Sequence, residues 1–253
     1  MLDFARCVGA LILREMATSY IRSPGGFLWA FAEPIAGIAL LSFVLSMAFQ
    51  APPLGDSFAL FYAAGLVPFL FYSDLSSKVA QSINYSRALL AYPRVSLIDA
   101  ILARFILNFL VQLAVASVIL AGIVALAGAD PRVDLAKVLV AFGMLGMFSM
   151  GVGTLNCFLL TKFPVWQRVW GIANRPLFVI SCIFFTFESI PERFQSVLWW
   201  NPVVHLVGLM RRAIYAPYRA EYVSLEYLAG ISLVLTIFGL IFLRRFGRDL
   251  VEG

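Results

Sequence analysis

Few side chains in this sequence have the type and spacing that catalysis or metal binding requires. Cys7, Cys157 and Cys182 lie far apart without a CxxC pair, and His205 is the single histidine, so this pattern argues against a zinc site. The sequence has no GxxxxGK[ST] loop for nucleotide phosphates, and no HExxH or GxSxG motif. We therefore predict that this chain is not an enzyme by itself.

The composition explains why chemistry-bearing residues are rare. Hydrophobic residues make up 62% of the 253 residues and charged residues only 13%, whereas soluble domains have roughly 45–50% and about 25%. A soluble fold of this size could not cover so large an apolar core, so the sequence predicts an integral membrane protein. The net charge of +5 then reflects basic residues between apolar runs rather than nucleic-acid binding.

Apolar runs of about 20 residues, the length that spans a bilayer, predict six transmembrane helices. The predicted spans are Phe27–Gln50, Phe58–Val79, Leu97–Ala127, Leu135–Leu160, Ile172–Phe187 and Leu225–Leu243.

The remaining segments complete an all-α integral membrane fold. In residues 1–23, apolar side chains fall on one helical face and basic side chains on the opposite face. This pattern predicts an amphipathic interface helix that ends before Ser23-Pro24-Gly25-Gly26. Residues 190–218 are apolar but interrupted by three prolines, which predicts two short re-entrant helices. The chain is expected to form a single domain over residues 1–253, with spans one to five in 27–187, the last span in 225–243 and a tail in 244–253.

The distribution of lysine and arginine predicts the orientation. Most of the 19 basic residues fall on one side of the predicted spans, together with both termini. The positive-inside rule therefore places both termini in the cytoplasm, which also requires an even number of spans.

The charged side chain and the aromatic side chains within the predicted spans each have two possible roles. We expect Glu33 to be the only charged residue well inside a span, either pairing with a basic residue or contacting a transport pathway. The abundant aromatic residues fit a membrane-interface belt, and they also fit a surface on which sugar rings stack. Candidates for such stacking include Phe69 and Tyr72 in the second span.

The run from Arg14 to Pro34 resembles the opening of type-2 ABC exporter permeases, in particular the branch that exports capsular polysaccharide in Gram-negative bacteria. The segments Asn156–Phe163 and Trp199–Leu206 resemble the fourth span and an outer motif of the same family. This resemblance implies a homodimer in the bacterial inner membrane, each chain resting on a separate ATPase subunit that binds ATP and Mg²⁺. It also implies periplasmic and outer-membrane export partners, and an acidic glycan on a phosphatidylglycerol anchor with a Kdo linker.

The resemblance also implies roles for individual residues. The expected ATPase-coupling residues are Arg14, Glu15, Arg22, Tyr92, Pro93 and Arg94. Charge, aromatic character and position select the expected substrate-contacting residues, which are Arg22, Arg168, Arg175, Trp29, Phe69, Tyr72, Trp166, Trp170 and His205.

Other functions remain open from the sequence. Within the same transporter class, the substrate could be O-antigen, teichoic acid or a small amphiphile. Outside it, the alternatives are a proton-coupled carrier, which usually needs several buried ionisable residues, and an intramembrane enzyme, which needs a catalytic dyad.

Overall fold

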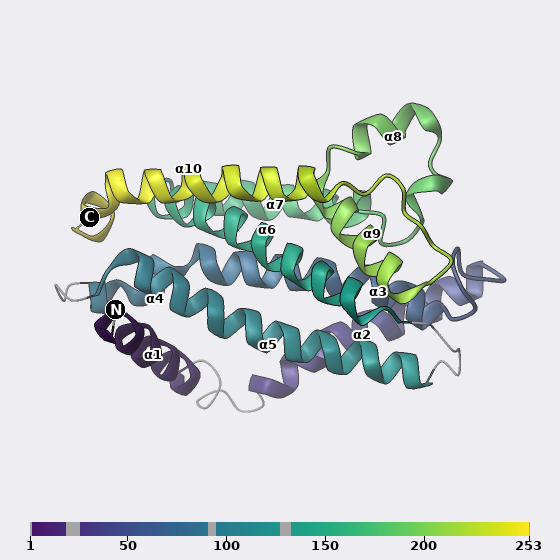
Figure 1. Ribbon diagram of the computed structural model, residues 1–253, viewed down its shortest axis with the longest axis horizontal. Coiled ribbons are helices and arrows are strands. Elements are labelled where there is room, and N and C mark those ends of the chain that lie inside the picture. The colour runs from purple at the N-terminus through teal and green to yellow at the C-terminus, as the bar shows by residue number, and fades with distance from the viewer. Residues whose placement is uncertain (1, 19–25, 91–94, 127–132, 253) are drawn as a thin grey trace.

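The computed structural model describes residues 2–18, 26–90, 95–126 and 133–252, and every regular element in these ranges is a helix. Figure 1 shows long helices that run side by side along the longest axis of the molecule. The helices are α1 (Leu2–Met16), α2 (Gly26–Ala48), α3 (Phe58–Ala80), α4 (Ser82–Leu90), α5 (Leu97–Leu126), α6 (Leu135–Lys162), α7 (Trp166–Ile180), α8 (Glu192–Leu198), α9 (Pro202–Ile214) and α10 (Leu225–Glu252), with a 3₁₀ turn at Phe187–Ser189.

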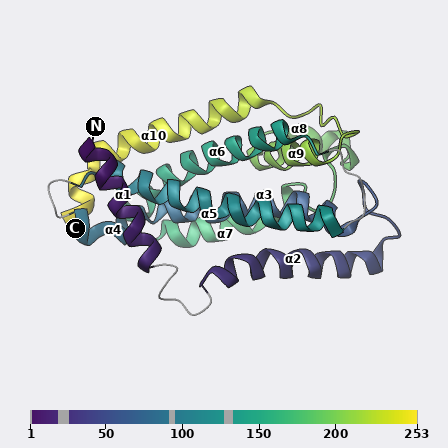
Figure 2. The same cartoon turned by 60° about the horizontal axis from the view of Figure 1, so that its bottom comes forward.

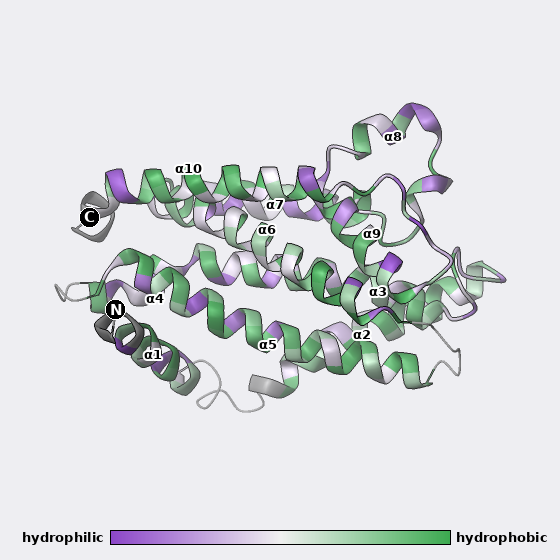
Figure 3. Cartoon of the chain, in the orientation of Figure 1, coloured by the Kyte–Doolittle hydropathy of each residue, from purple (hydrophilic) through white to green (hydrophobic). Residues whose placement is uncertain are grey.

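Five helices in the described part of the chain are long and apolar enough to cross a membrane by length and composition. These are α2, α3 with its continuation into α4, α5, α6 and α10. Figure 3 shows that they are mostly hydrophobic, while hydrophilic residues gather in α1, in α8 and at both ends of the bundle. The all-helical membrane fold is confirmed, whereas the predicted count of six spans is not.

The predicted fifth span, Ile172–Phe187, differs from the structure. Helix α7 begins earlier, at Trp166, and ends at Ile180 after only 15 residues. Cys182 has a φ of 59°, a left-handed conformation that stops the helix. The break is stabilised by a buried arginine of α9, described below, and an apolar run alone gives no sign of such a tertiary contact.

The segments outside the spans also have definite structures. Helix α1 packs against α5 and crosses one end of the bundle obliquely (Figure 2). Two short helices precede the last span as predicted, and α9 packs against α3 and α6 while α8 stands away from the bundle. The predicted tail at 244–253 is instead the continuation of α10 to Glu252.

The start of α1 and the end of α10 lie at the same end of the bundle in both views, and α8 and α9 lie at the other (Figures 1 and 2). The core is built around α3, whose inward face is buried between α5, α6 and α9. Apolar side chains of α2, including Leu28, Phe43 and Met47, are exposed. In a bilayer, such a surface meets lipid or another protein chain.

Helices α6 and α10 pack closely enough to require glycine. A Cβ atom on Gly239 would lie 2.7 Å from the backbone nitrogen of Leu155 and 2.8 Å from the carbonyl carbon of Thr154. Gly230, on the same helix, has no heavy atom within 4 Å of its Cβ position.

We expect Gly239→Ala to lower the free energy of unfolding by about 1–3 kcal/mol, because the backbone of α6 cannot make room for the new methyl group. Gly230→Ala should raise it slightly, by up to about 1 kcal/mol, through helix propensity alone. Thermal unfolding of both variants in the same detergent tests this, and equal midpoints would contradict the close packing.

Candidate functional site

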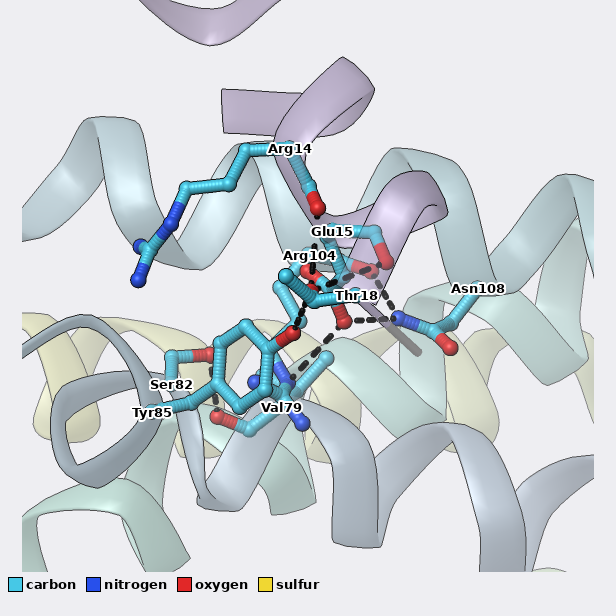
Figure 4. A network of polar contacts seen from close by, with 8 residues as sticks. All are labelled: Arg14, Glu15, Thr18, Val79, Ser82, Tyr85, Arg104 and Asn108. Atoms are coloured by element: carbon cyan, nitrogen blue, oxygen red, sulfur yellow. Dashed lines mark hydrogen bonds and ion pairs between the residues drawn. The ribbon is translucent and has the colours of Figure 1, made fainter. Parts of the chain in front are cut away.

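A buried polar cluster joins α1 to α5 at the end of the bundle where the chain begins (Figure 4). The Glu15 carboxylate of α1 is buried and lies 3.6 Å from Nε of Arg104 on α5, which is also buried. Asn108, one turn further along α5, donates from Nδ2 to Oε1 of Glu15 at 3.2 Å and to the carbonyl oxygen of Arg104 at 2.8 Å. The cluster therefore holds α1 to α5 by an ion pair and an amide hydrogen bond.

Helix α4 joins this cluster through Tyr85. The Arg104 guanidinium carbon lies 4.2 Å from the centre of the Tyr85 ring, and that of Arg14 lies 6.0 Å away. The Tyr85 hydroxyl is hydrogen-bonded to the Thr18 hydroxyl, which follows α1, and Thr18 also donates to the Arg14 carbonyl oxygen at 2.9 Å. Residues of three helices, α1, α4 and α5, thus meet at Arg104.

The predicted coupling residues fall into three groups in the structure. Arg14 is exposed at the end of α1, as a contact with another subunit requires. Glu15 is buried, so its carboxylate binds within the chain rather than to a partner's surface. Arg22 and the segment 92–94, which contains Tyr92, Pro93 and Arg94, lie outside the described residues.

Arg104 and Asn108 were missed by the sequence reasoning. The expectation that Glu33 would be the only charge well inside a span is wrong, because Arg104 is buried within α5. Asp74 of α3 also lies inside a span, where it accepts a hydrogen bond from Gln112 of α5 at 2.9 Å. The spacing of Arg104 and Asn108, one helical turn apart in an apolar run, was the available signal.

Helix α7 presents two chemically different faces. Arg168 and Arg175 are exposed and lie on one side of the helix, since residues seven apart share a face. Trp166, Trp170 and Leu177 share the opposite side and line a cavity that α3, α6, α9 and α10 also line. An arginine pair is costly against hydrocarbon, so the basic face fits an aqueous passage or another chain.

The remaining predicted substrate residues have different environments. Trp29 is exposed on α2, while Phe69 and Tyr72 are buried in α3. Tyr72 lines the same cavity as Trp166 and Trp170, whose rings stack with their centres 6.4 Å apart. Phe69 packs against Phe178 of α7. The structure therefore brings three of the predicted aromatic residues together around one cavity, and it leaves Trp29 and Phe69 apart from it.

His205 of α9 is fully buried, with both ring nitrogens engaged. The Ser224 backbone N–H donates to Nδ1 at 3.2 Å, so Nε2 carries the proton and donates to the Trp199 carbonyl oxygen at 2.7 Å. Burial lowers the pKa of His205, which favours this neutral form. The ring stabilises the turns around α9 and is not presented to a substrate.

Arg211 of α9 is the largest fully buried side chain among the described residues and was assigned no role from the sequence. Its Nη1 donates to the Phe185 carbonyl oxygen at 2.8 Å and its Nη2 to the Ile183 carbonyl oxygen at 2.9 Å. The guanidinium carbon also lies 4.1 Å from the centre of the Phe61 ring on α3. Arg211 therefore fixes the broken backbone after α7 to both α9 and α3.

The sequence of this chain is similar to those of known transport proteins along nearly its whole length. The chain is 36% identical to the polysialic acid transport protein KpsM of Escherichia coli over 234 residues, which cover 92% of this chain and 90% of the relative. It is 27% identical to the capsule polysaccharide export inner-membrane protein BexB of Haemophilus influenzae, covering 97% and 92%. It is also 24% identical to the O-antigen export system permease protein RfbA of Klebsiella pneumoniae, covering 90% and 86%.

The family model named ABC-2 type transporter matches residues 6–215, which include the polar cluster at α1, the basic face of α7 and the whole of α9. This chain belongs to the ABC-2 type transporter family.

Proposed function

We propose that this chain is the membrane permease of an ATP-driven exporter that moves a lipid-linked acidic capsular polysaccharide across the bacterial inner membrane. The observation that carries the proposal is the similarity to capsule exporters over nearly the whole length of both chains. The permease is a transport subunit, so ATP and Mg²⁺ bind to a separate ABC ATPase subunit. Similarity to an O-antigen export permease supports export of that glycan as the second candidate, at lower identity.

The assembly that fits this function is a homodimer of the permease with two ATPase subunits. The exposed apolar surface of α2 and the exposed basic face of α7 both need a cover that the single chain does not provide. Periplasmic and outer-membrane export proteins would receive the polymer at the end of the bundle that contains α8. Both termini would be cytoplasmic, which agrees with their position at one end of the molecule.

The polar cluster at α1 suggests how ATP hydrolysis reaches the membrane. Closure of the ATPase subunits would push α1, and the ion pair between Glu15 and Arg104 would transmit this displacement to α5. The contact of Arg104 with Tyr85 would transmit it to α4 and so to α3. In this mechanism Arg14 contacts the ATPase directly, while Glu15 acts through Arg104.

Arg168 and Arg175 would attract the acidic polymer along the exposed face of α7. We expect the double change Arg168→Gln and Arg175→Gln to lower export by at least about tenfold, because a hydrogen bond to a charged group contributes about 1.5–3 kcal/mol. The measurement is the amount of capsule on the cell surface relative to the amount retained inside.

Arg219→Gln is the matched control, since Arg219 is also exposed but lies in the loop between α9 and α10. It should leave export unchanged. Normal export by the double variant, at normal abundance in the membrane, would contradict the assignment of α7 to the polymer pathway.

A further inference from the structure

The cavity beside α7 is a slot whose walls are almost entirely apolar. It has a volume of about 260 Å³ and lies between Phe148, Leu155 and Leu159 of α6, Trp170 and Leu177 of α7, and Leu235 of α10. This volume exceeds that of an engineered apolar cavity of about 150 Å³ that stays dry and binds benzene. Water has few polar partners along these walls, so hydrocarbon is the occupant that the lining favours.

Helix α7 leaves this slot open because it packs loosely. None of its 15 residues is buried. Its first turn is tied to α6 by Nε1 of Trp166, which donates to Oδ1 of Asn156 at 2.8 Å. Just beyond its last turn, Ser181 Oγ accepts a hydrogen bond from Nδ2 of Asn201 at 3.2 Å. The helix is therefore held near both ends, and the space between is not filled by protein side chains.

The shape of the slot fits a chain-like occupant. From Phe148 to Leu159 the α6 wall is roughly 16 Å long, at about 1.5 Å per residue. The slot's lining residues from Phe148 to Leu159 of α6 and Leu235 of α10 belong to helices that are long and apolar enough to span a membrane. An extended acyl chain lies in the same direction as these helices.

A basic residue, Lys162, stands in the sequence between Leu159 and Trp166, which both line the slot. Lys162, in the last turn of α6, is exposed and has no carboxylate oxygen within 4.0 Å among the described residues, although its Nζ lies 5.7 Å from the Phe246 ring centre. Helix α7 begins at Trp166 without a side-chain cap, so the positive end of its dipole lies at this tryptophan. Tryptophan at this position is typical of the membrane–water interface.

We infer that this slot is a binding site for one acyl chain of an anionic phospholipid of the surrounding membrane, with the headgroup phosphate at Lys162 and the first turn of α7. The lipid would pack against the side of α7 that carries Trp170 and Leu177. The opposite side, with its two arginines, would remain uncovered by this lipid. The proposed substrate is itself lipid-linked, so the test uses membranes that contain free phospholipid and no glycan.

The test uses the permease in complex with its ATPase, reconstituted in nanodiscs that contain phosphatidylglycerol with a diazirine in one acyl chain. After illumination, mass spectrometry locates the crosslinks. We expect crosslinks enriched at least fivefold on the slot-lining peptides of α6 and α7 over the exposed face of α2. Equal labelling of the slot and of α2 would overturn the proposal.

Two substitutions on α7 form a matched pair. Leu177→Trp should fill the slot and reduce its labelling at least fivefold, whereas Ile172→Trp, which adds the same ring at an exposed position, should leave labelling unchanged. Neither original side chain is buried, so both variants should fold. Labelling that is unaffected by Leu177→Trp would contradict the site.

Lys162→Gln tests the headgroup separately, since Lys162 is exposed and its replacement should not disturb folding. In wild-type protein, unlabelled phosphatidylglycerol should compete several-fold better than phosphatidylcholine, and in the variant the two should compete equally. Equal competition already in the wild type would overturn the headgroup assignment. Because crosslinking needs no transport, failure here would leave the proposed export function untouched.

Discussion

Replacing Arg104 with methionine is expected to lower transport-coupled ATPase activity at least about tenfold. The substitution leaves the Glu15 carboxylate buried without its ion-pair partner. Breaking one side of a buried ion pair typically destabilises the local structure by about 3–5 kcal/mol. Helix α1 would then detach from α5, and a push on α1 would no longer reach the bundle.

The double variant Glu15→Leu with Arg104→Met distinguishes the loss of the ion pair from the loss of α1 docking onto α5. Replacing both members of a buried pair by apolar side chains is often neutral for stability, so α1 should dock again and most of the coupling should return. Arg6→Gln serves as the control, because Arg6 is exposed on the same helix. Wild-type coupling in the Arg104→Met variant would show that α1 does not act through this pair.

Arg211→Met should produce a large loss of stability. The change removes two hydrogen bonds and leaves the carbonyl oxygens of Ile183 and Phe185 buried without these donors. Unsatisfied buried acceptors cost about 1–3 kcal/mol each, so we expect a loss of about 2–6 kcal/mol. For a chain of this size, this corresponds to a decrease in the unfolding midpoint of roughly 5–20 °C.

Arg212→Met provides the matched control, because Arg212 is the adjacent arginine of α9 but is exposed. Its unfolding midpoint should stay near that of the wild type. Arg211→Lys should recover only part of the loss, since an ammonium group lacks the planar fork that reaches both carbonyl groups. Equal midpoints for the Arg211 and Arg212 variants would refute the structural role of Arg211.

The long helices could be predicted from the sequence because a membrane span is recognised by the length and hydropathy of its apolar run. The starts and ends of α2, α3, α5 and α6 fall within two residues of the predicted spans. These boundaries depend on local composition and on turn residues, which the sequence displays directly. The same reasoning correctly predicted an amphipathic helix at the start of the chain and two short helices before the last span.

The buried arginines could not be placed in the same way. Arg211 stands next to an exposed arginine in α9 and looks like a residue at the membrane surface, yet it binds carbonyl oxygens 26 and 28 residues away in the sequence. Those contacts also hold the non-helical backbone just after α7, where the sequence predicted that the fifth span would continue. Long-range pairing of this kind depends on how helices pack, which hydropathy does not encode.

The predicted site residues also divide into those that the structure shows exposed and those that it shows buried. Arg168 and Arg175 were selected from charge and position, and the structure shows both exposed on α7, while their role in transport stays a prediction. Glu15 and His205 were chosen from the family resemblance and from their positions, and the structure places both in the interior with partners of their own. A single sequence does not show whether a polar residue is satisfied within its own chain.

The most direct test of the account is ATPase activity of this permease purified with its ATPase in lipid, with and without a lipid-linked acidic glycan. We expect the glycan to stimulate hydrolysis several-fold, and this stimulation to be lost in Arg104→Met and in the double variant Arg168→Gln and Arg175→Gln. A stable complex that ignores the glycan but responds to small amphiphiles would contradict a polysaccharide exporter. Failure to associate with any ABC ATPase would contradict the permease assignment itself.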